Sequence, residues 1–319
     1  MKRLISFLKD WMLPIGMTAG ALIYMLYRNL HFLAPAGPFC LNAITRIQPV
    51  LLFLMLFLTF CKIEPRQLKF QKWHLWLLLI QAGLFSILST LLARTPDFSG
   101  KVVVEAAMLC LICPTATAAA VVTGKLGGDM AGLITYTILI NLVTAILVPL
   151  FVPLIHPMEG RTFFSSFLMI VAKVFPLLIC PSLLAWLVRY LLPGLHKRIL
   201  KYPDLAFYIW AVSLTLAITM TVRSIYHSNV GVLLLSLIGL ASLICCIFQF
   251  FAGKAIGRRY GMEITAGQSL GQKNTVFAIW MGYTFLSPVV SVAGGFYCIW
   301  HNCFNSWQLY KASNHEHAC

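Results

Sequence analysis

The chain has 319 residues, of which 60% are hydrophobic and only 10% are charged, and its mean hydropathy is +0.86. Soluble domains usually contain about 25% charged residues, so this composition indicates an integral membrane protein built from helices. The net charge of +15 would favour nucleic-acid binding in a soluble protein. Here the basic residues fall in short loops between apolar segments, where they set membrane orientation, and we expect no nucleic-acid partner.

Ten apolar segments can be placed along the chain. The first follows a basic N-terminus, but its apolar run is long for a signal peptide and lacks a convincing cleavage site, so we interpret it as a membrane helix. The loops are short, which predicts a single transmembrane domain over 1–319, with 311–319 as a flexible tail. We predict the segments at Trp11–Tyr27, Leu41–Phe60, Trp73–Leu92, Val102–Gly124, Met130–Ile155, Phe163–Leu192, Leu205–Val222, Val230–Ala252, Ile264–Leu286 and Val289–Leu309.

The distribution of Lys and Arg predicts the orientation in the membrane. If the N-terminus is cytoplasmic, the loops on the cytoplasmic side contain most of the 24 basic residues, which is the bias that membrane proteins show. An even number of spans then places the C-terminus on the same side. We therefore predict a multi-pass protein of the cell membrane with both termini in the cytoplasm. Only Lys173 and Lys273 fall within apolar segments.

Two apolar segments contain residues that disfavour a continuous helix. In the fourth segment, Cys113-Pro114 is followed by a run of small residues, and Pro114 lacks the N–H that a helix requires. The ninth segment contains Gly267-Gln268-Ser269-Leu270-Gly271-Gln272-Lys273-Asn274. Lipid cannot satisfy backbone groups freed by a break, so such breaks persist only inside protein or beside water. Interrupted segments in corresponding halves indicate a transporter's binding site, and a simple kink in each helix is the alternative.

The two halves of the chain, about 1–156 and 160–310, have similar sequence features in the same order. Leu13-Pro14 and the apolar run after it correspond to Phe175-Pro176 and the run that follows, and the two interruptions recur at a similar spacing. Because each half contains five segments, the second half enters the membrane from the opposite side. The predicted fold class is therefore an all-α integral membrane protein with ten transmembrane helices in a five-plus-five inverted repeat.

Several short motifs are distributed over nearly the whole chain. They are Leu58-Thr59-Phe60 with Pro65, Gln81, Cys113-Pro114 with Thr117, Gly128-Asp129, Gly271 with Asn274, and Trp300-His301-Asn302. These motifs resemble those of the bile acid:sodium symporter family. The resemblance implies a panel domain and a core domain, with helices four and nine crossing at their breaks near Pro114 and Gly271. It also implies symport of an organic anion with sodium ions bound beside that crossing.

The sequence departs from the family pattern at the positions that the resemblance assigns to sodium. A Ser-Asn pair after the first break is replaced by Ala119 and Ala120, and a serine of the fifth segment is replaced by Leu133. The acidic residue and the Gln of the second break are replaced by Ser269 and Lys273. Sodium requires several oxygen ligands, so we expect transport without sodium and without another cofactor or metal. The candidate substrate or ion ligands are Lys273, Asn274, Gln272, Ser269, Gln81, Thr115, Thr117 and Thr137.

Lys273 is the most informative candidate, because an ionisable residue inside a membrane segment is a functional-site hypothesis by default. It lies well away from both ends of its segment, which disfavours a side chain that reaches the membrane interface. Three roles stay open from the sequence. Its ammonium group could replace bound sodium as a fixed cation, pair with an anionic substrate, or gain and lose a proton during transport.

The sequence contains no nucleotide-binding loop, no GxSxG motif and no paired intramembrane carboxylates, so we expect neither an enzyme nor an ATP-driven pump. The expected function is a secondary transporter that moves a small or amphipathic organic anion by alternating access. The alternatives are a non-transporting membrane receptor or sensor on the same fold, and a sodium-coupled symporter with rearranged ion ligands. The expected partners are the organic anion and the lipid bilayer.

Overall fold

The computed structural model describes residues 12–227 and 230–316. Within these ranges the chain is almost entirely helical, and its only extended pairing is an antiparallel bridge between Thr115 and Lys273. Short 3-10 helices cover His31–Ala36 and Pro65–Gln67. The α-helices are α2 (Met12–Asn29), α3 (Gly37–Cys61), α4 (Lys72–Arg94), α5 (Lys101–Ile112), α6 (Ala119–Lys125), α7 (Met130–Ile155), α8 (Phe163–Leu178), α9 (Cys180–Leu191), α10 (Pro193–Leu200), α11 (Leu205–His227), α12 (Val232–Arg258), α13 (Glu263–Gly271), α14 (Thr275–Phe285) and α15 (Pro288–Glu316).

Several of these helices have the length and composition of membrane spans. Within the described part of the chain, α3, α4, α7, α11 and α12 are each long and apolar enough to cross a membrane, and α8 with α9 would form a sixth span with a 42° bend. Pro176 near the end of α8 and Pro181 at the start of α9 explain the bend, because neither can donate a helical hydrogen bond. The chain is therefore an all-helical, multi-pass membrane protein.

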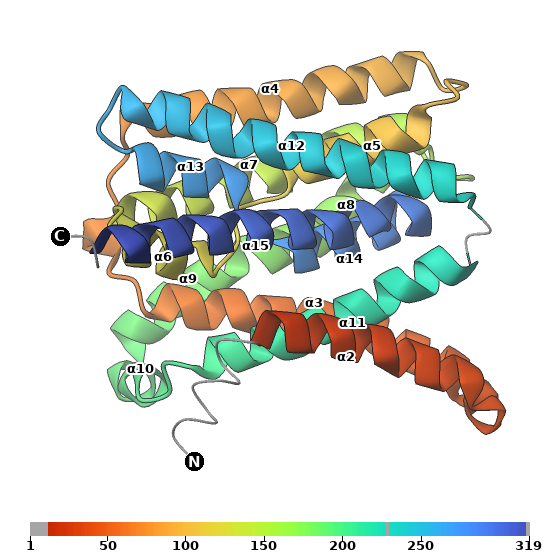
Figure 1. The fold of residues 1–319 in the computed structure, drawn as a ribbon, viewed down its shortest axis with the longest axis horizontal. Coiled ribbons are helices and arrows are strands. Elements are labelled where there is room, and N and C mark those ends of the chain that lie inside the picture. Colours follow the sequence, from red (N-terminus) through yellow and green to blue (C-terminus); the bar gives the residue numbers. More distant parts are fainter. Residues whose placement is uncertain (1–11, 228–229, 317–319) are drawn as a thin grey trace.

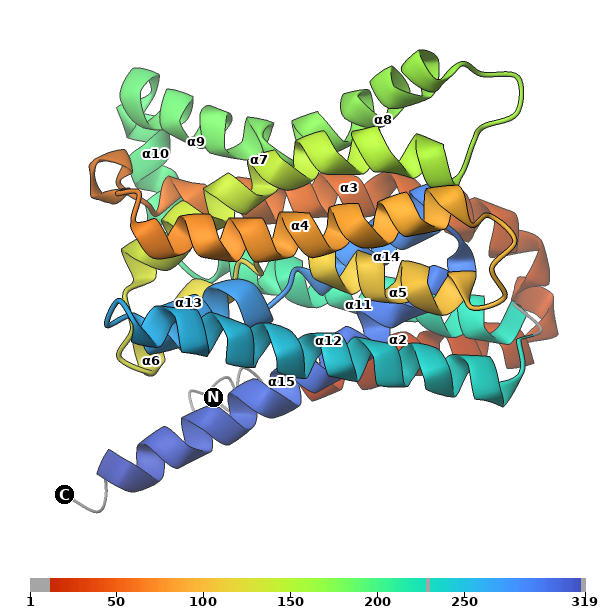
Figure 2. The same cartoon turned by 90° about the horizontal axis from the view of Figure 1, so that it is seen from above.

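Most helices run along the long axis of the molecule (Figure 1), and the connections between them gather at its two ends. The connections α4–α5 and α11–α12 lie at one end, and the connection α12–α13 and helix α10 lie at the other (Figures 1 and 2). A hydrogen bond agrees with the placement of α10 at this second end. Lys62, just after α3, donates it to the carbonyl of Pro203, which lies between α10 and α11. Helices α5, α13 and α14 consist mostly of buried residues and lie in the interior of this bundle, whereas α6 has an exposed face at Val121.

The helices pack through small residues where they approach most closely. On α12, a Cβ added at Gly253 would lie 2.5 Å from the carbonyl oxygen of Ala266 on α13. On α2, a Cβ added at Gly20 would lie 2.6 Å from the carbonyl oxygen of Thr215 on α11. Glycine is needed at such contacts because any side chain would separate the two backbones, and close approach of small residues is how helices associate in lipid. The largest core cluster then surrounds α5 and α14.

Two segments differ from the sequence-based expectation. Helix α15 continues to Glu316, so residues 311–316, which we predicted as part of a flexible tail, are helical; residues 317–319 lie outside the described residues. Pro193–Leu200, which we predicted as a loop, forms α10. Its proline occupies the first helical position, where a missing N–H costs nothing, and this explains why a Pro-Gly pair begins a helix here.

Candidate functional site

Both interrupted helices break inside the protein, and the two breaks pair with each other. Helix α5 ends at Ile112 and α6 begins at Ala119, whereas α13 ends at Gly271 and α14 begins at Thr275. The N–H of Ala116 donates to the carbonyl of Gln272 at 2.9 Å, and the N–H of Asn274 donates to the carbonyl of Pro114 at 2.8 Å. Each break therefore provides the other with backbone hydrogen-bond partners, which lipid could not provide. We call this antiparallel arrangement of residues 113–118 and 272–274 the crossing.

Polar side chains satisfy the carbonyl groups left free at the end of α5. The amide nitrogen of Gln81 on α4 donates to the carbonyls of Ile112 and Cys113, at 3.2 and 2.9 Å. The hydroxyl of Tyr136 on α7 donates in turn to the amide oxygen of Gln81 at 2.8 Å, and the hydroxyl of Thr144 donates to the carbonyl of Ile112 at 3.1 Å. Gln81, a predicted ligand, therefore uses its side chain to hold the first break.

The second break is held from α12 and α15. The hydroxyl of Tyr297 donates to the carbonyl of Gly271 at 2.8 Å, and the amide nitrogen of Gln249 donates to the hydroxyl of Tyr297 at 3.0 Å. The side-chain oxygen of Asn274 accepts a hydrogen bond from the N–H of Phe277 and so caps α14. Tyr297 and Gln249 were missed by sequence reasoning. A polar residue in a largely apolar helix is the signal that could have found them.

Polar atoms without a hydrogen-bond partner concentrate around the crossing. Buried unpaired polar groups are rare in native proteins, and each one calls for an explanation. Here the residues concerned are at most 4% exposed, and several of them were predicted as ligands. The unpaired atoms are Ser269 Oγ, Gln272 Oε1, Lys273 Nζ, Asn274 Nδ2, Gln268 Oε1 and Gln249 Oε1.

The side chain of Lys273 is 1% exposed, and among the described residues its Nζ has no hydrogen-bond partner. The alternative interpretation, a lysine that extends to the membrane interface, is therefore wrong. Its backbone belongs to the bridge with Thr115, and its N–H donates to Nδ1 of His301 on α15 at 3.3 Å. The titratable groups near its amine are the thiols of Cys110, Cys113, Cys245 and Cys246.

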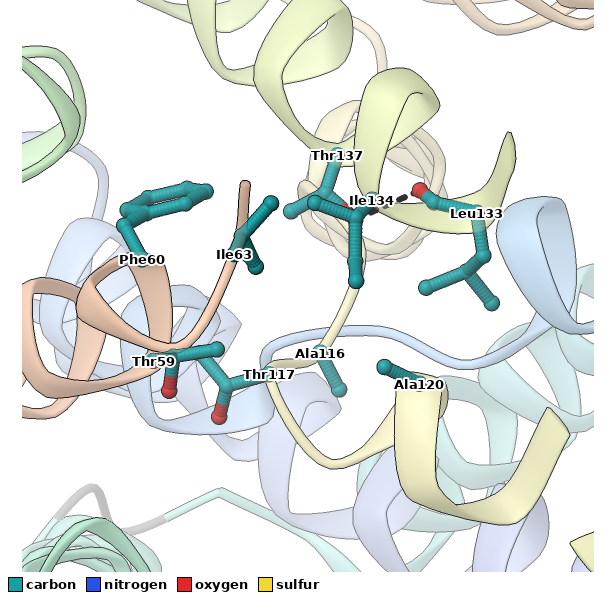
Figure 3. A pocket seen from close by; sticks show the side chains of 9 residues that line it. All are labelled: Thr59, Phe60, Ile63, Ala116, Thr117, Ala120, Leu133, Ile134 and Thr137. Atoms are coloured by element: carbon teal, nitrogen blue, oxygen red, sulfur yellow. Dashed lines mark hydrogen bonds between the residues drawn. The ribbon is translucent and has the colours of Figure 1, made fainter. Parts of the chain in front are cut away.

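A narrow hollow lies beside the first break (Figure 3), and its volume of about 10 Å³ has room for about one water-sized molecule. Side chains face it from three places: the end of α3 and the residue Ile63 after it, the first break with the start of α6, and α7. Thr117 and Thr137, two predicted ligands, line this hollow, and so do Ala120 and Leu133. The hydroxyl of Thr137 donates to the carbonyl of Leu133 within its own helix. Most of the wall is therefore hydrocarbon.

The predicted site residues accordingly fall into two neighbouring groups. Thr115, Ser269, Gln272, Lys273 and Asn274 meet at the crossing, whereas Thr117 and Thr137 line the hollow beside it. The two groups are joined through the short stretch from Thr115 to Thr117. Phe60, Ile63 and Ile134 also line the hollow and were not predicted; as ordinary apolar residues they give no sequence signal.

A second polar cluster lies at the opposite end of α5 from the crossing. The carboxylate of Glu105, which is 2% exposed, lies 3.0 Å from Nε2 of His156 at the end of α7. It also lies 3.9 Å from the ammonium group of Lys101. The described residues contain no group of three or more His, Cys, Asp or Glu side chains that could hold a metal ion. The ammonium group of Lys101 also donates to the carbonyl of Ile155 at 3.3 Å, so this cluster links α5 to the end of α7.

No family model matches the chain, and no curated protein matches it significantly.

Proposed function

We propose that this protein is a secondary transporter of the bile acid:sodium symporter superfamily, and that it moves a small or amphipathic organic anion by alternating access. The observation that carries this proposal is the pairing of two helix breaks around a set of buried, unpaired polar atoms. Interrupted helices that meet inside a bundle create substrate sites in secondary transporters, because their free backbone groups and half-helix ends can face a ligand.

We further propose ten spans in two inverted repeats. In this assignment α5 with α6, α8 with α9, and α13 with α14 each count as one interrupted or bent span. The clustering of connections at two ends of the bundle supports it (Figure 1), because loops predicted as cytoplasmic lie together at one end. The basic residues of those loops favour a cytoplasmic location for that end and for both termini.

The hollow of Figure 3 is the proposed substrate site. Its wall is mostly hydrocarbon, from residues such as Phe60, Ile134 and Leu133, and the helices around it would have to move apart before an organic anion could enter. The negative charge of the substrate would be offset by Lys273, whose bridge partner Thr115 lies close in the chain to Ala116 and Thr117 of the wall.

Counterflow in proteoliposomes tests this function. Vesicles loaded with unlabelled anion should accumulate the same labelled anion, and the probes are taurocholate, pyruvate and nicotinate, each tested alone after a thermal-shift screen. Exchange of one of them supports a transporter. Binding without exchange would favour the receptor alternative, and the absence of both would contradict the proposal for this class of anion.

A pair of neighbouring substitutions locates the site. Ala120→Leu adds volume to the wall of the hollow and should lower exchange, whereas Val121→Leu changes a side chain that is 60% exposed on the outer face of α6 and should not. Equal effects of the two substitutions on exchange would contradict the assignment of the hollow as the substrate site.

A further inference from the structure

We propose that Lys273 couples one proton to each negative charge that the protein transports, so that the substrate is an organic anion moved together with a proton. This inference rests on the proposed transport function. It selects one of the three roles that the sequence left open for this residue, and it follows from where the side chain points and from what surrounds it.

The side chain of Lys273 does not line the hollow. None of the residues that line the hollow comes from α12, α13, α14 or α15, whereas the titratable groups near the amine belong to α5, to the first break and to α12. A direct contact between the amine and a substrate in the hollow is therefore disfavoured. The titratable groups around Lys273 are Cys110 on α5, Cys113 just after it, Cys245 and Cys246 on α12, and Tyr297 and His301 on α15.

None of these groups offers a counter-charge to the amine. The thiol of Cys113 donates to the carbonyl of Asn274 at 2.9 Å, the thiol of Cys110 to the carbonyl of Ala293, and the thiol of Cys245 to the carbonyl of Ala107. Within the described ranges, no salt bridge includes Lys273. A neutral thiol is a weak acceptor, so this environment can hold a neutral amine far more readily than an ammonium ion.

The low dielectric constant around Lys273 makes the charge of its amine depend on the charge of the substrate. An isolated charge is very costly to bury in a medium of low dielectric constant, but a pair of opposite charges is much less costly. The occluded crossing therefore tolerates two states: a neutral amine without an anion, and an ammonium ion with an anion in the neighbouring hollow. The two uncompensated states, which are an ammonium ion alone and an anion beside a neutral amine, are disfavoured.

Because only these two states are tolerated, a single residue can couple the transport of a proton to the transport of an anion. When the crossing opens to one compartment, the lone pair of the Lys273 amine forms an N–H bond with a proton from water as the anion enters the hollow. When the crossing opens to the other compartment, the anion leaves and the proton returns to water there. The empty carrier then returns with a neutral amine. For a monovalent anion, each cycle moves one anion and one proton and no net charge.

The experiment separates exchange from net transport in proteoliposomes, with taurocholate, pyruvate and nicotinate as probes. In the parent protein, an acidic exterior should drive net uptake against the anion gradient without creating a membrane potential. Taurocholate is the most informative probe, because its sulfonate stays ionised and cannot cross lipid as a neutral acid. Protein-free vesicles correct for passive entry of the other two.

Two substitutions of Lys273 should have opposite effects. Lys273→Arg keeps a permanent positive charge, so exchange should continue while net uptake driven by the pH gradient is lost, because the empty carrier cannot return. Lys273→Met removes the charge, so exchange should fall by about tenfold or more, since each 1.36 kcal/mol added to a barrier is a factor of ten. The control is Lys173→Met, which removes an exposed lysine of α8 and should change neither process.

A measurement without substrate keeps the inference testable if a variant transports poorly. The melting temperatures of the parent and of Lys273→Met are compared in detergent from pH 6 to pH 9.5, after size-exclusion chromatography confirms folding. The parent should gain stability relative to the variant as the pH rises, because the buried amine then loses its charge. A constant difference would overturn the inference.

The two proposals fail in different ways. Exchange in the parent without a response to the pH gradient, or Lys273→Arg with unchanged gradient-driven uptake, would contradict proton coupling while leaving the transport function standing. No exchange of any probe would contradict the transport function itself.

Discussion

The hydroxyl of Thr115 donates a hydrogen bond to the main-chain carbonyl of Ser269, 2.7 Å away, although the two residues lie 154 positions apart. Ser269 belongs to the last turn of α13, where carbonyl groups lose their helical partners because the helix ends at Gly271. Thr115 thus replaces a missing backbone N–H of the other half of the chain. The crossing is held by side chains as well as by its two backbone hydrogen bonds.

Thr115→Val should therefore destabilise the protein by about 1–3 kcal/mol, because it leaves the buried carbonyl of Ser269 without its partner. Thr115→Ser restores a hydroxyl and should recover most of the loss. Thr90→Val is the matched control, because the hydroxyl of Thr90 bonds only within its own helix on an exposed face. Melting temperatures in detergent measure the difference, and equal losses for Thr115→Val and Thr90→Val would contradict the prediction.

Gly271→Ala should destabilise the protein by about 1–3 kcal/mol through overpacking. An added Cβ would overlap the ring of Phe250, which is fully buried and packs at a centroid distance of 4.2 Å against Phe304, so the ring cannot move away. Gly83→Ala on α4 is the control, since a Cβ there meets no atom within 4 Å. The control should keep its melting temperature or raise it slightly; a similar loss at both positions would refute the packing argument.

His156→Ala should cost about 1–3 kcal/mol, since it removes the polar side chain that lies 3.0 Å from the buried carboxylate of Glu105. Replacing both residues, as Glu105→Gln with His156→Ala, should recover part of that loss, because no charge is then left buried without its partner. Thermal unfolding of the two variants and the parent provides the comparison. A double variant that is no more stable than His156→Ala would exclude a stabilising contact between the two side chains.

Transport should not require sodium. Ala120 and Leu133 present hydrocarbon to the hollow, and sodium must be surrounded by oxygen atoms to replace its water. Uptake of taurocholate, pyruvate or nicotinate should therefore be equal when sodium is replaced by choline at constant pH gradient. A loss of uptake in choline would favour the alternative of a sodium symporter with rearranged ligands.

Arg258 at the end of α12 and Glu263 at the start of α13 form an exposed, pH-dependent contact. Arg258 donates hydrogen bonds of 2.7 and 3.1 Å to the two carboxylate oxygens of Glu263, which lowers the pKa of Glu263 from its usual value of 4.5. A lowered carboxylate pKa stabilises the folded state above the pKa of the unfolded chain, and the stabilisation disappears as the pH falls through the folded pKa. Glu263→Gln should therefore lower the melting temperature slightly at pH 7 and not at pH 3. The same small loss at both pH values would exclude the charged contact.

The positions of the two breaks could be predicted because their causes are local. Pro114 has no N–H to donate, and the Gly and polar residues around Gly271 are poor partners for a helix in lipid. Helix α10 could not be predicted from its Pro-Gly pair, because the same two residues suit a turn or a helix start. The end of α15 was placed too early because a polar sequence after Leu309 gives no sign of whether the helix continues.

The interior of the site was much harder to predict than the location of the site. Lys273 could be singled out as a charge in an apolar segment, but its neighbours come from packing between distant helices. The amide of Gln249 reaches the carbonyl of Cys110 across 139 positions, and no local pattern encodes that contact. Likewise, nothing in the sequence around Gln81 distinguishes a ligand from the support of a helix end that it forms.

The crossing also sets the order in which this protein can be assembled during synthesis. The thiol of Cys113 donates a hydrogen bond to the main-chain carbonyl of Asn274, 161 positions later in the chain. The carbonyl of Pro114 accepts a hydrogen bond from the N–H of the same residue. At about 5–20 residues per second, a ribosome needs roughly 8–30 s to make the intervening chain. During that time the first break has unpaired groups, so it must stay in the insertion machinery or beside water rather than enter lipid.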